Sequence, residues 1–130
     1  MHNRLAFVVE DDASVAEAYA EVLRQSGFEV EVLRSGKAAQ DRLAEAVPSV
    51  VVLDLNLPVV TGDTLLAGIR ADTRLAETRV IVSTGEPQRA KALRAQPDLV
   101  LVKPVSMAQL GAFANRLRFG TGKLNDSDDD

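Results

Sequence analysis

The chain contains five short apolar runs, and they are the feature that most limits what it can fold into. The runs span residues 5–9, 28–33, 50–53, 80–83 and 99–102. Four of them are continuous stretches rich in Val, Ile and Leu, which is typical of parallel strands covered on both faces. The run at 28–33 instead alternates apolar residues with Glu29 and Glu31, which indicates an edge strand with one face partly in water.

Helical patterns occupy the segments between the runs. Each pattern starts at residues that can cap a helix or form its first turn: Ser14 with Glu17 as a capping box, Ser35, Gly62, Pro87, and Ser106 with Gln109 as a second capping box. Gly27 and Pro48 are expected to end the first two helices. A strand followed by a helix, five times in succession, predicts an α/β domain with a parallel sheet.

Length and composition exclude several classes of protein. With 130 residues, 46% of them hydrophobic, the chain is long enough for one domain with its own core. It has no cysteine, which excludes a disulfide scaffold, a thiolate metal site and a cysteine nucleophile. No apolar run approaches the length of about 18 residues that suggests a membrane span. The start of the chain lacks the pattern of a signal peptide, so we expect a cytoplasmic protein.

The charges divide the chain into a body and a tail. There are 19 acidic and 15 basic residues, and four of the acidic residues lie among the last five positions. The rest of the chain is therefore electrically balanced, which argues against nucleic acid as its primary ligand. We expect a folded domain over residues 1–120 and an acidic, disordered tail over residues 121–130.

Polar residues follow the predicted strands at the positions where sheets of this kind bind ligands. Such ligands lie outside the carboxyl ends of the strands, near the point where strand order reverses. Glu10, Asp11 and Asp12 follow the first run, Asp54 the third, Thr84 the fourth and Lys103 the fifth. A single acidic residue after a strand is usually a helix N-cap, the role we expect of Asp12. Together, however, these residues bring three carboxylates, those of Glu10, Asp11 and Asp54, around one ammonium group.

This surplus of negative charge predicts a cation site. Crowded carboxylates cost free energy unless a cation is bound or a proton is taken up. Mg²⁺ is the usual occupant of sites that combine few carboxylates with phosphate. The Thr84 hydroxyl and the Lys103 ammonium can then hold phosphoryl oxygens, so the parts present are sufficient for phosphoryl transfer onto Asp54.

Four motifs, VVED, DLNLPVVTG, VIVSTG and LVKPV, resemble in their order the receiver domains of two-component response regulators, of the single-domain or hybrid-kinase type. The resemblance covers residues 5–117. It implies a flavodoxin-like, doubly wound (βα)5 fold with a parallel five-stranded sheet in the order 2-1-3-4-5. It also implies a turn marked by Pro58 and Gly62, where glycine permits unusual backbone dihedrals, and a cis bond between Lys103 and Pro104.

The resemblance further implies a role for each site residue. Asp54 matches the phosphoacceptor, Thr84 the switch hydroxyl and Lys103 the lysine of the family's site. The implied Mg²⁺ ligands are Glu10, Asp11, Asp54 and the backbone carbonyl of Asn56. The expected partner is a histidine kinase or a histidine phosphotransfer protein, with no direct nucleic acid or membrane ligand. The domain is then not an enzyme beyond catalysing its own phosphorylation and dephosphorylation.

The chain departs from the family pattern in ways that bear on signalling. Val100 stands where an aromatic residue is common, three positions before Lys103, and Val105 follows the Lys-Pro pair in place of a common Phe. The segment between Thr84 and Lys103 is short, which predicts a trimmed fourth helix. Asn56 and Glu86 are both polar and able to orient an attacking water, so we expect a short-lived phosphate.

Other functions fit the sequence less well. A phosphatase of the haloacid dehalogenase type would carry its nucleophile after the first strand, and Asn56 stands where its general acid would be. A flavodoxin-like or dinucleotide-binding protein needs a phosphate loop after the first strand, where Glu10 and its acidic neighbours would repel phosphate. Ser-His-Asp catalysis is excluded because His2, at the terminus, is the only histidine. The alternative that stays open is a phosphorylation-independent pseudo-receiver acting as a protein-interaction module.

Overall fold

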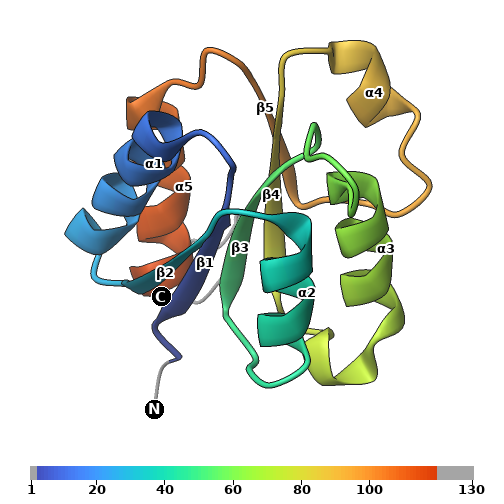
Figure 1. Cartoon of the computed structure of the whole chain (residues 1–130). Coiled ribbons are helices and arrows are strands. Elements are labelled where there is room, and N and C mark those ends of the chain that lie inside the picture. Colours follow the sequence, from blue (N-terminus) through green and yellow to red (C-terminus); the bar gives the residue numbers. More distant parts are fainter. Residues whose placement is uncertain (1–2, 120–130) are drawn as a thin grey trace.

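The computed structural model describes residues 3–119, which form a parallel five-stranded sheet between two layers of helices (Figure 1). The strands are β1 (Leu5–Val9), β2 (Glu29–Leu33), β3 (Val50–Asp54), β4 (Arg79–Thr84) and β5 (Leu99–Val102). The helices are α1 (Ala13–Gln25), α2 (Gly36–Leu43), α3 (Gly62–Ala71), α4 (Pro87–Lys91) and α5 (Met107–Phe119), with a short 3₁₀ turn η1 (Thr73–Leu75). The strand order is β2-β1-β3-β4-β5, so the predicted fold class is confirmed. The predicted acidic tail lies outside the described residues.

The sheet separates two hydrophobic clusters, because successive residues of a strand point to opposite faces. Phe7, Val51 and Leu53 pack on the face covered by α2 and α3. Val8 and Val52 pack on the opposite face, which α1 and α5 cover (Figure 1). The central strands are thus buried on both sides, as their continuous apolar sequences predict, and β2 lies at an edge of the sheet. The same prediction for the run at 99–102 is wrong, because β5 forms the other edge and exposes Val100 and Val102.

The helix starts agree with the sequence in most places and differ in one. The Ser35 and Ser106 side chains each accept a hydrogen bond from a backbone N–H at the start of their helices, and Pro87 begins α4. The predicted capping box of Ser14 and Glu17 is wrong, because Ser14 already lies inside α1. Asp12 caps this helix instead.

The Asp12 cap rests on a hydrogen bond that its Oδ1 accepts from the backbone N–H of Val15, at 3.0 Å. The Glu17 side chain instead accepts from Arg24, at 2.8 Å. Helix α2 ends at Leu43, before the expected stop at Pro48.

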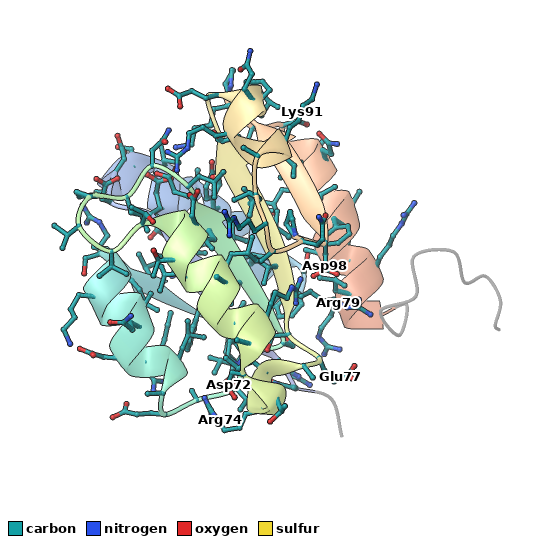
Figure 2. All side chains as sticks on the ribbon, turned by 90° about the vertical axis from the view of Figure 1, so that its right-hand side faces the viewer. Asp72, Arg74, Glu77, Arg79, Lys91 and Asp98 are labelled. Atoms are coloured by element: carbon teal, nitrogen blue, oxygen red, sulfur yellow. The ribbon has the colours of Figure 1, made fainter. Side chains whose placement is uncertain are left out.

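The fourth helix has five residues, which confirms the predicted trimming. The irregular segment that follows is fastened to the sheet by Asp98. The Asp98 Oδ2 atom accepts from the backbone N–H of Val80 at 2.7 Å and from Arg70 at 2.8 Å. Arg79 lies 3.4 Å from the other carboxylate oxygen, and Figure 2 shows it beside Asp98 below the exposed Lys91 of α4. These contacts hold β5 in register although little helix precedes it.

Within residues 3–119 the longest helices have 13 residues, and none of the helices is long and apolar enough to cross a bilayer.

Candidate functional site

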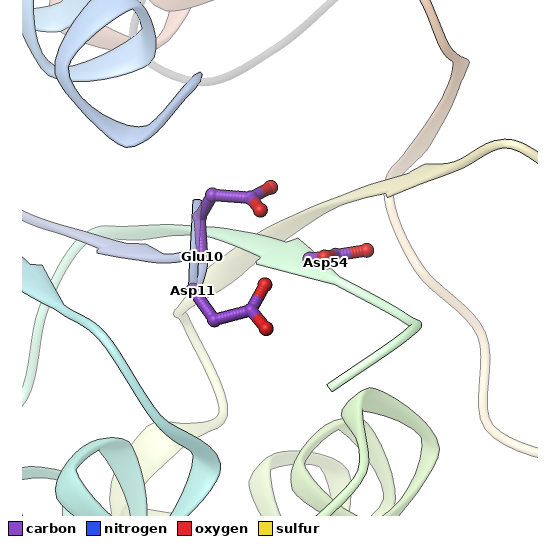
Figure 3. A group of neighbouring side chains, drawn as sticks. All are labelled: Glu10, Asp11 and Asp54. Atoms are coloured by element: carbon purple, nitrogen blue, oxygen red, sulfur yellow. The ribbon is translucent and has the colours of Figure 1, made fainter. Parts of the chain in front are cut away.

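Three carboxylates converge at the carboxyl end of the sheet (Figure 3). Val9 of β1 pairs with Leu53 of β3, so the next residue of each strand, Glu10 and Asp54, emerges beside the other. Asp11 follows in the loop, and one carboxylate oxygen from each of the three residues lies within 4.8 Å of the others. Glu10 and Asp54 are only 1% and 3% exposed, whereas Asp11 is exposed. The structure therefore brings together the acidic residues that the sequence selected.

The loop that carries Asp11 is held from two sides. The backbone N–H of Asp12 donates to Glu10 Oε2 at 3.2 Å. The Arg34 guanidinium, which follows the edge strand β2, donates to the backbone carbonyl of Asp11 through Nη2 at 2.6 Å and Nε at 3.2 Å. Arg34 thus fixes the backbone on which the exposed carboxylate is mounted, a role that its position in the sequence did not indicate.

Lys103 supplies the positive charge facing this cluster. Its Nζ lies 3.3 Å from Glu10 Oε1 and 3.5 Å from Asp54 Oδ2. The backbone N–H of Lys103 donates to the carbonyl of Thr84 at 2.8 Å, which ties the end of β5 to the end of β4. The bond from Lys103 to Pro104 is cis, as expected. The lysine is thereby fixed on the side of Asp54 toward β5.

Burial and neighbouring charges act together on Glu10 and Lys103. Burial, reinforced by the charge of Asp54, raises the pKa of Glu10, although the Asp12 N–H and Lys103 act in the opposite direction. Burial alone would lower the pKa of Lys103, but the charges of Asp54 and Glu10 outweigh it and raise that pKa. The site therefore keeps its lysine charged and favours an additional cation or a proton.

The turn after Asp54 packs closely against the acceptor. The backbone N–H of Asn56 donates to Asp54 Oδ1 at 3.0 Å. A Cβ atom on Gly62 would lie 2.4 Å from the Asp54 carbonyl oxygen and 2.7 Å from the Cα of Leu55. The expected reason for glycine at position 62, unusual dihedrals, is wrong, because the positive φ of this turn belongs to the exposed Val59, at 65°. Gly62 is needed for space.

Thr84 is buried at the end of β4 and its hydroxyl is engaged by the loop that follows. The oxygen accepts from the backbone N–H of Glu86 at 2.9 Å and donates to the Glu86 carbonyl at 3.3 Å. Since Asp54 pairs with Ser83 in the sheet register, Thr84 lies one residue beyond the strand end that carries the acceptor. Thr84 therefore lies at the same end of the sheet as the acid cluster, with its hydroxyl held by the β4–α4 loop.

Arg89 is a residue near the site that sequence reasoning missed. Its guanidinium donates to the side-chain oxygen of Asn56 and, through Nη2, to Asp63 Oδ1 at 2.6 Å. These partners lie 33 and 26 positions away in the chain, so no local pattern connects them. The Asn56 side chain, expected to be free to orient water, is instead bound to α4.

The chain matches the family model described as "Response regulator receiver domain" over residues 6–115. It is similar to the transcriptional regulatory protein PrrA of Mycobacterium leprae, with 35% identity over 111 residues that cover 85% of this chain and 48% of that protein. It is also similar to the regulatory protein LuxO of Vibrio vulnificus, with 31% identity over 93% of this chain and 27% of that protein. The chain spans about half the length, or less, of these curated relatives.

Solved structures show the same fold. The signal receiver domain of a signal transduction histidine kinase from Syntrophus aciditrophicus superposes with a TM-score of 0.80 and 25% identity, over 96% of each chain. Response regulator DrrB of Thermotoga maritima superposes with a TM-score of 0.77 and 29% identity, over 98% of this chain and 58% of DrrB.

Proposed function

The chain belongs to the family of response regulator receiver domains, and on that premise we propose that it accepts a phosphoryl group on Asp54 in two-component signalling. The observation that carries the proposal is the setting of the Asp54 carboxylate. Asp54 is 3% exposed, and its Oδ2 lies 3.5 Å from the Lys103 ammonium nitrogen. One of its carboxylate oxygens lies within 4.8 Å of a carboxylate oxygen of Glu10 and one of Asp11. A carboxylate held beside a fixed positive charge is placed to act as a nucleophile toward a phosphoryl group.

The proposed donor is a phosphohistidine on a histidine kinase or a histidine phosphotransfer protein. An Asp54 carboxylate oxygen forms a new bond to phosphorus, the bond from phosphorus to the imidazole nitrogen breaks, and that nitrogen keeps the electron pair. Lys103 neutralises charge on the phosphoryl oxygens as the transfer proceeds. The Thr84 hydroxyl exchanges its bond to the Glu86 carbonyl for a charge-assisted bond to the phosphoryl group.

The same acid cluster fits a divalent cation with hard oxygen ligands. Asp11, Asp54 and the Asn56 carbonyl would hold Mg²⁺, with Glu10 acting through water, and the donor set of carboxylate and carbonyl oxygens suits that ion. When bound, Mg²⁺ would neutralise the carboxylates and the phosphoryl oxygens, so that two negatively charged groups can approach each other.

We propose that the domain later hydrolyses its own aspartyl phosphate and carries no other enzymatic activity. Its output would pass through contacts with a protein partner, since the charges outside the acidic end of the chain are balanced and provide no field that attracts nucleic acid.

Intact-mass measurement after incubation with acetyl phosphate and Mg²⁺ tests the assignment. The wild-type chain should gain one adduct of about 80 Da, the mass of a phosphoryl group, and chelation of Mg²⁺ should prevent it. Asp54→Ala should gain none. Asp12→Ala serves as a control because Asp12 caps α1 and lies next to the same loop, and it should be phosphorylated normally.

Two outcomes contradict the proposal. An adduct on Asp54→Ala would mean that a different residue is the acceptor. A folded wild-type chain that gains no adduct from acetyl phosphate or from any phosphohistidine donor would instead support the pseudo-receiver alternative.

A further inference from the structure

Arg89 connects the short fourth helix to Asn56, two residues after the acceptor. Its Nη1 atom donates to Asn56 Oδ1, and the backbone N–H of Asn56 donates to Asp54 Oδ1 at 3.0 Å. A continuous chain of contacts therefore runs from the acceptor carboxylate through Asn56 to α4. The Arg89 guanidinium thus reaches the acceptor only through Asn56 and is not part of the acid cluster.

Two partners from different segments fix the guanidinium. Besides Asn56, in the loop after β3, it binds Asp63 in the first turn of α3, with 2.6 Å between Nη2 and Oδ1. The Arg89 side chain is 33% exposed, so water screens these contacts only in part. The two partners take different nitrogens of the guanidinium, so the hydrogen bond to Asn56 does not require the ion pair with Asp63.

The atom of Asn56 that Arg89 engages matters for hydrolysis. In the hydrolysis of an aspartyl phosphate, the water oxygen bonds to phosphorus, the bond from phosphorus to the Asp54 oxygen breaks, and the carboxylate keeps the electron pair. Both water protons stay with the phosphate, which leaves as dihydrogen phosphate. A side chain that accepts a hydrogen bond from this water turns a lone pair of the water toward phosphorus.

An asparagine amide can accept only through Oδ1, since its nitrogen is a donor. In this chain that oxygen is occupied by a charged donor, which forms a stronger hydrogen bond than a neutral one. The oxygen keeps a second lone pair, but its contact with Arg89 directs it toward α4, so it is not free to turn toward a water at Asp54.

We propose that Arg89 prolongs the phosphorylated state of Asp54 by holding the Asn56 amide oxygen away from the attacking water. This inference rests on the proposed function, and it reverses the short lifetime that the sequence suggested. Arg89 is a positioning residue: it acts through Asn56, and removing it should speed dephosphorylation only while Asn56 is present.

The test is a double-mutant cycle on the decay of the phosphorylated chain. Wild type, Arg89→Ala, Asn56→Ala and the double variant are phosphorylated with acetyl phosphate and Mg²⁺, freed from donor by desalting, and followed by intact mass. Arg89→Ala should lose phosphate about five-fold faster than wild type, the size of effect that one hydrogen bond contributes. Asn56→Ala and the double variant should decay at rates within about two-fold of each other, because Arg89 has no effect once the Asn56 side chain is gone.

Asp63→Ala separates this role from simple anchoring of α4. It removes the ionic partner of Arg89 and leaves the contact with Asn56, so its decay should stay within about two-fold of wild type. Thermal unfolding of every variant records any change in stability independently of the decay rate.

The outcomes distinguish the inference from the function beneath it. If Arg89→Ala accelerates decay equally with and without Asn56, or if Asp63→Ala accelerates it as much, then Arg89 only anchors α4 and the inference is overturned. If wild type and Arg89→Ala accept phosphate and decay at equal rates, the inference fails and the proposed function stands. If wild type accepts no phosphate at all, both the inference and the proposed function are contradicted.

Discussion

Gly62 lies against the backbone of Asp54 so closely that a Cβ atom at position 62 would stand 2.4 Å from the Asp54 carbonyl oxygen. The first turn of α3 is therefore packed directly on the residue that carries the candidate acceptor carboxylate. Both atoms nearest to the missing Cβ belong to the backbone, of Asp54 and of Leu55, and neither can rotate away as a side chain would. The spacing between α3 and β3 thus depends on the absence of a side chain at one position.

Gly62→Ala should therefore disturb the site as well as the fold. We expect a loss of about 1–3 kcal/mol in the free energy of unfolding, as in other overpacked interiors, together with slower phosphorylation by acetyl phosphate. Gly68→Ala is the matched control, because residue 68 lies in the same helix and a Cβ there meets nothing within 4 Å. That variant should gain about 0.4–1 kcal/mol by urea denaturation and be phosphorylated at the normal rate. Equal stability of the two variants would contradict the close packing.

Asp11 and Asp12 are neighbours with different expected roles. Asp11→Ala should lower Mg²⁺-dependent phosphorylation by at least about tenfold without loss of stability, since removing one carboxylate relieves like-charge repulsion. Asp12→Ala should lose about 1 kcal/mol of stability with the α1 cap and keep its Mg²⁺ dependence. Initial rates at several Mg²⁺ concentrations, combined with thermal unfolding, separate the two effects. An Asp11→Ala chain with a normal rate would remove Asp11 from the metal site.

The raised pKa of Glu10 predicts how stability changes with pH in the metal-free chain. Burial raises this pKa above the value of 4.5 that applies to the unfolded chain, so between the two values the folded state binds more protons than the unfolded state. The free energy of unfolding then falls as pH rises from about 4.5 through the folded pKa, and it levels off above that pKa.

Glu10→Gln lacks this titration. Its free energy of unfolding should exceed that of wild type at about pH 7, and the difference should shrink as the pH is lowered toward about 4.5. Urea denaturation with a chelator present, at a series of pH values, measures the difference. A difference that stays constant over this range would show that Glu10 titrates as an ordinary surface carboxyl.

A phosphoryl mimic should perturb the fourth helix more than the last strand. The Thr84 hydroxyl is bonded to the backbone of Glu86, so its movement toward a phosphoryl group pulls directly on the start of α4. Val100 is 36% exposed, short and stiff about its first torsion, and cannot act as an aromatic lever. We expect beryllofluoride with Mg²⁺ to shift amide NMR signals strongly over residues 83–90 and weakly over residues 99–102.

Thr84→Ala provides the control for this response. It should bind beryllofluoride and yet lose most of the shifts over residues 86–90, because the link to α4 is cut. Strong shifts over residues 99–102 in wild type, or a dimer induced by the mimic, would indicate a route through β5 instead.

The sequence by itself determined the sheet and the location of the site. Continuous apolar runs predicted the buried strands, and the residue following each run, such as Glu10 or Lys103, is carried to the carboxyl end of its strand whatever the loops do. These features depend on periodicity and chain direction, which a linear sequence records directly. The residue that caps α1 was harder to predict, because both Asp12 and Ser14 can cap a helix. In the structure the hydrogen bonds of the β1–α1 loop place Asp12 at the cap.

Only the tertiary structure decided what surrounds the acceptor. Gly62 is required because α3 packs on Asp54, and Arg89 reaches Asn56 across 33 positions because folding brings α4 next to the loop that follows β3. The physical reason is that such contacts depend on the distance between elements after packing and on the reach of a long side chain. Neither quantity leaves a period or a motif in the sequence.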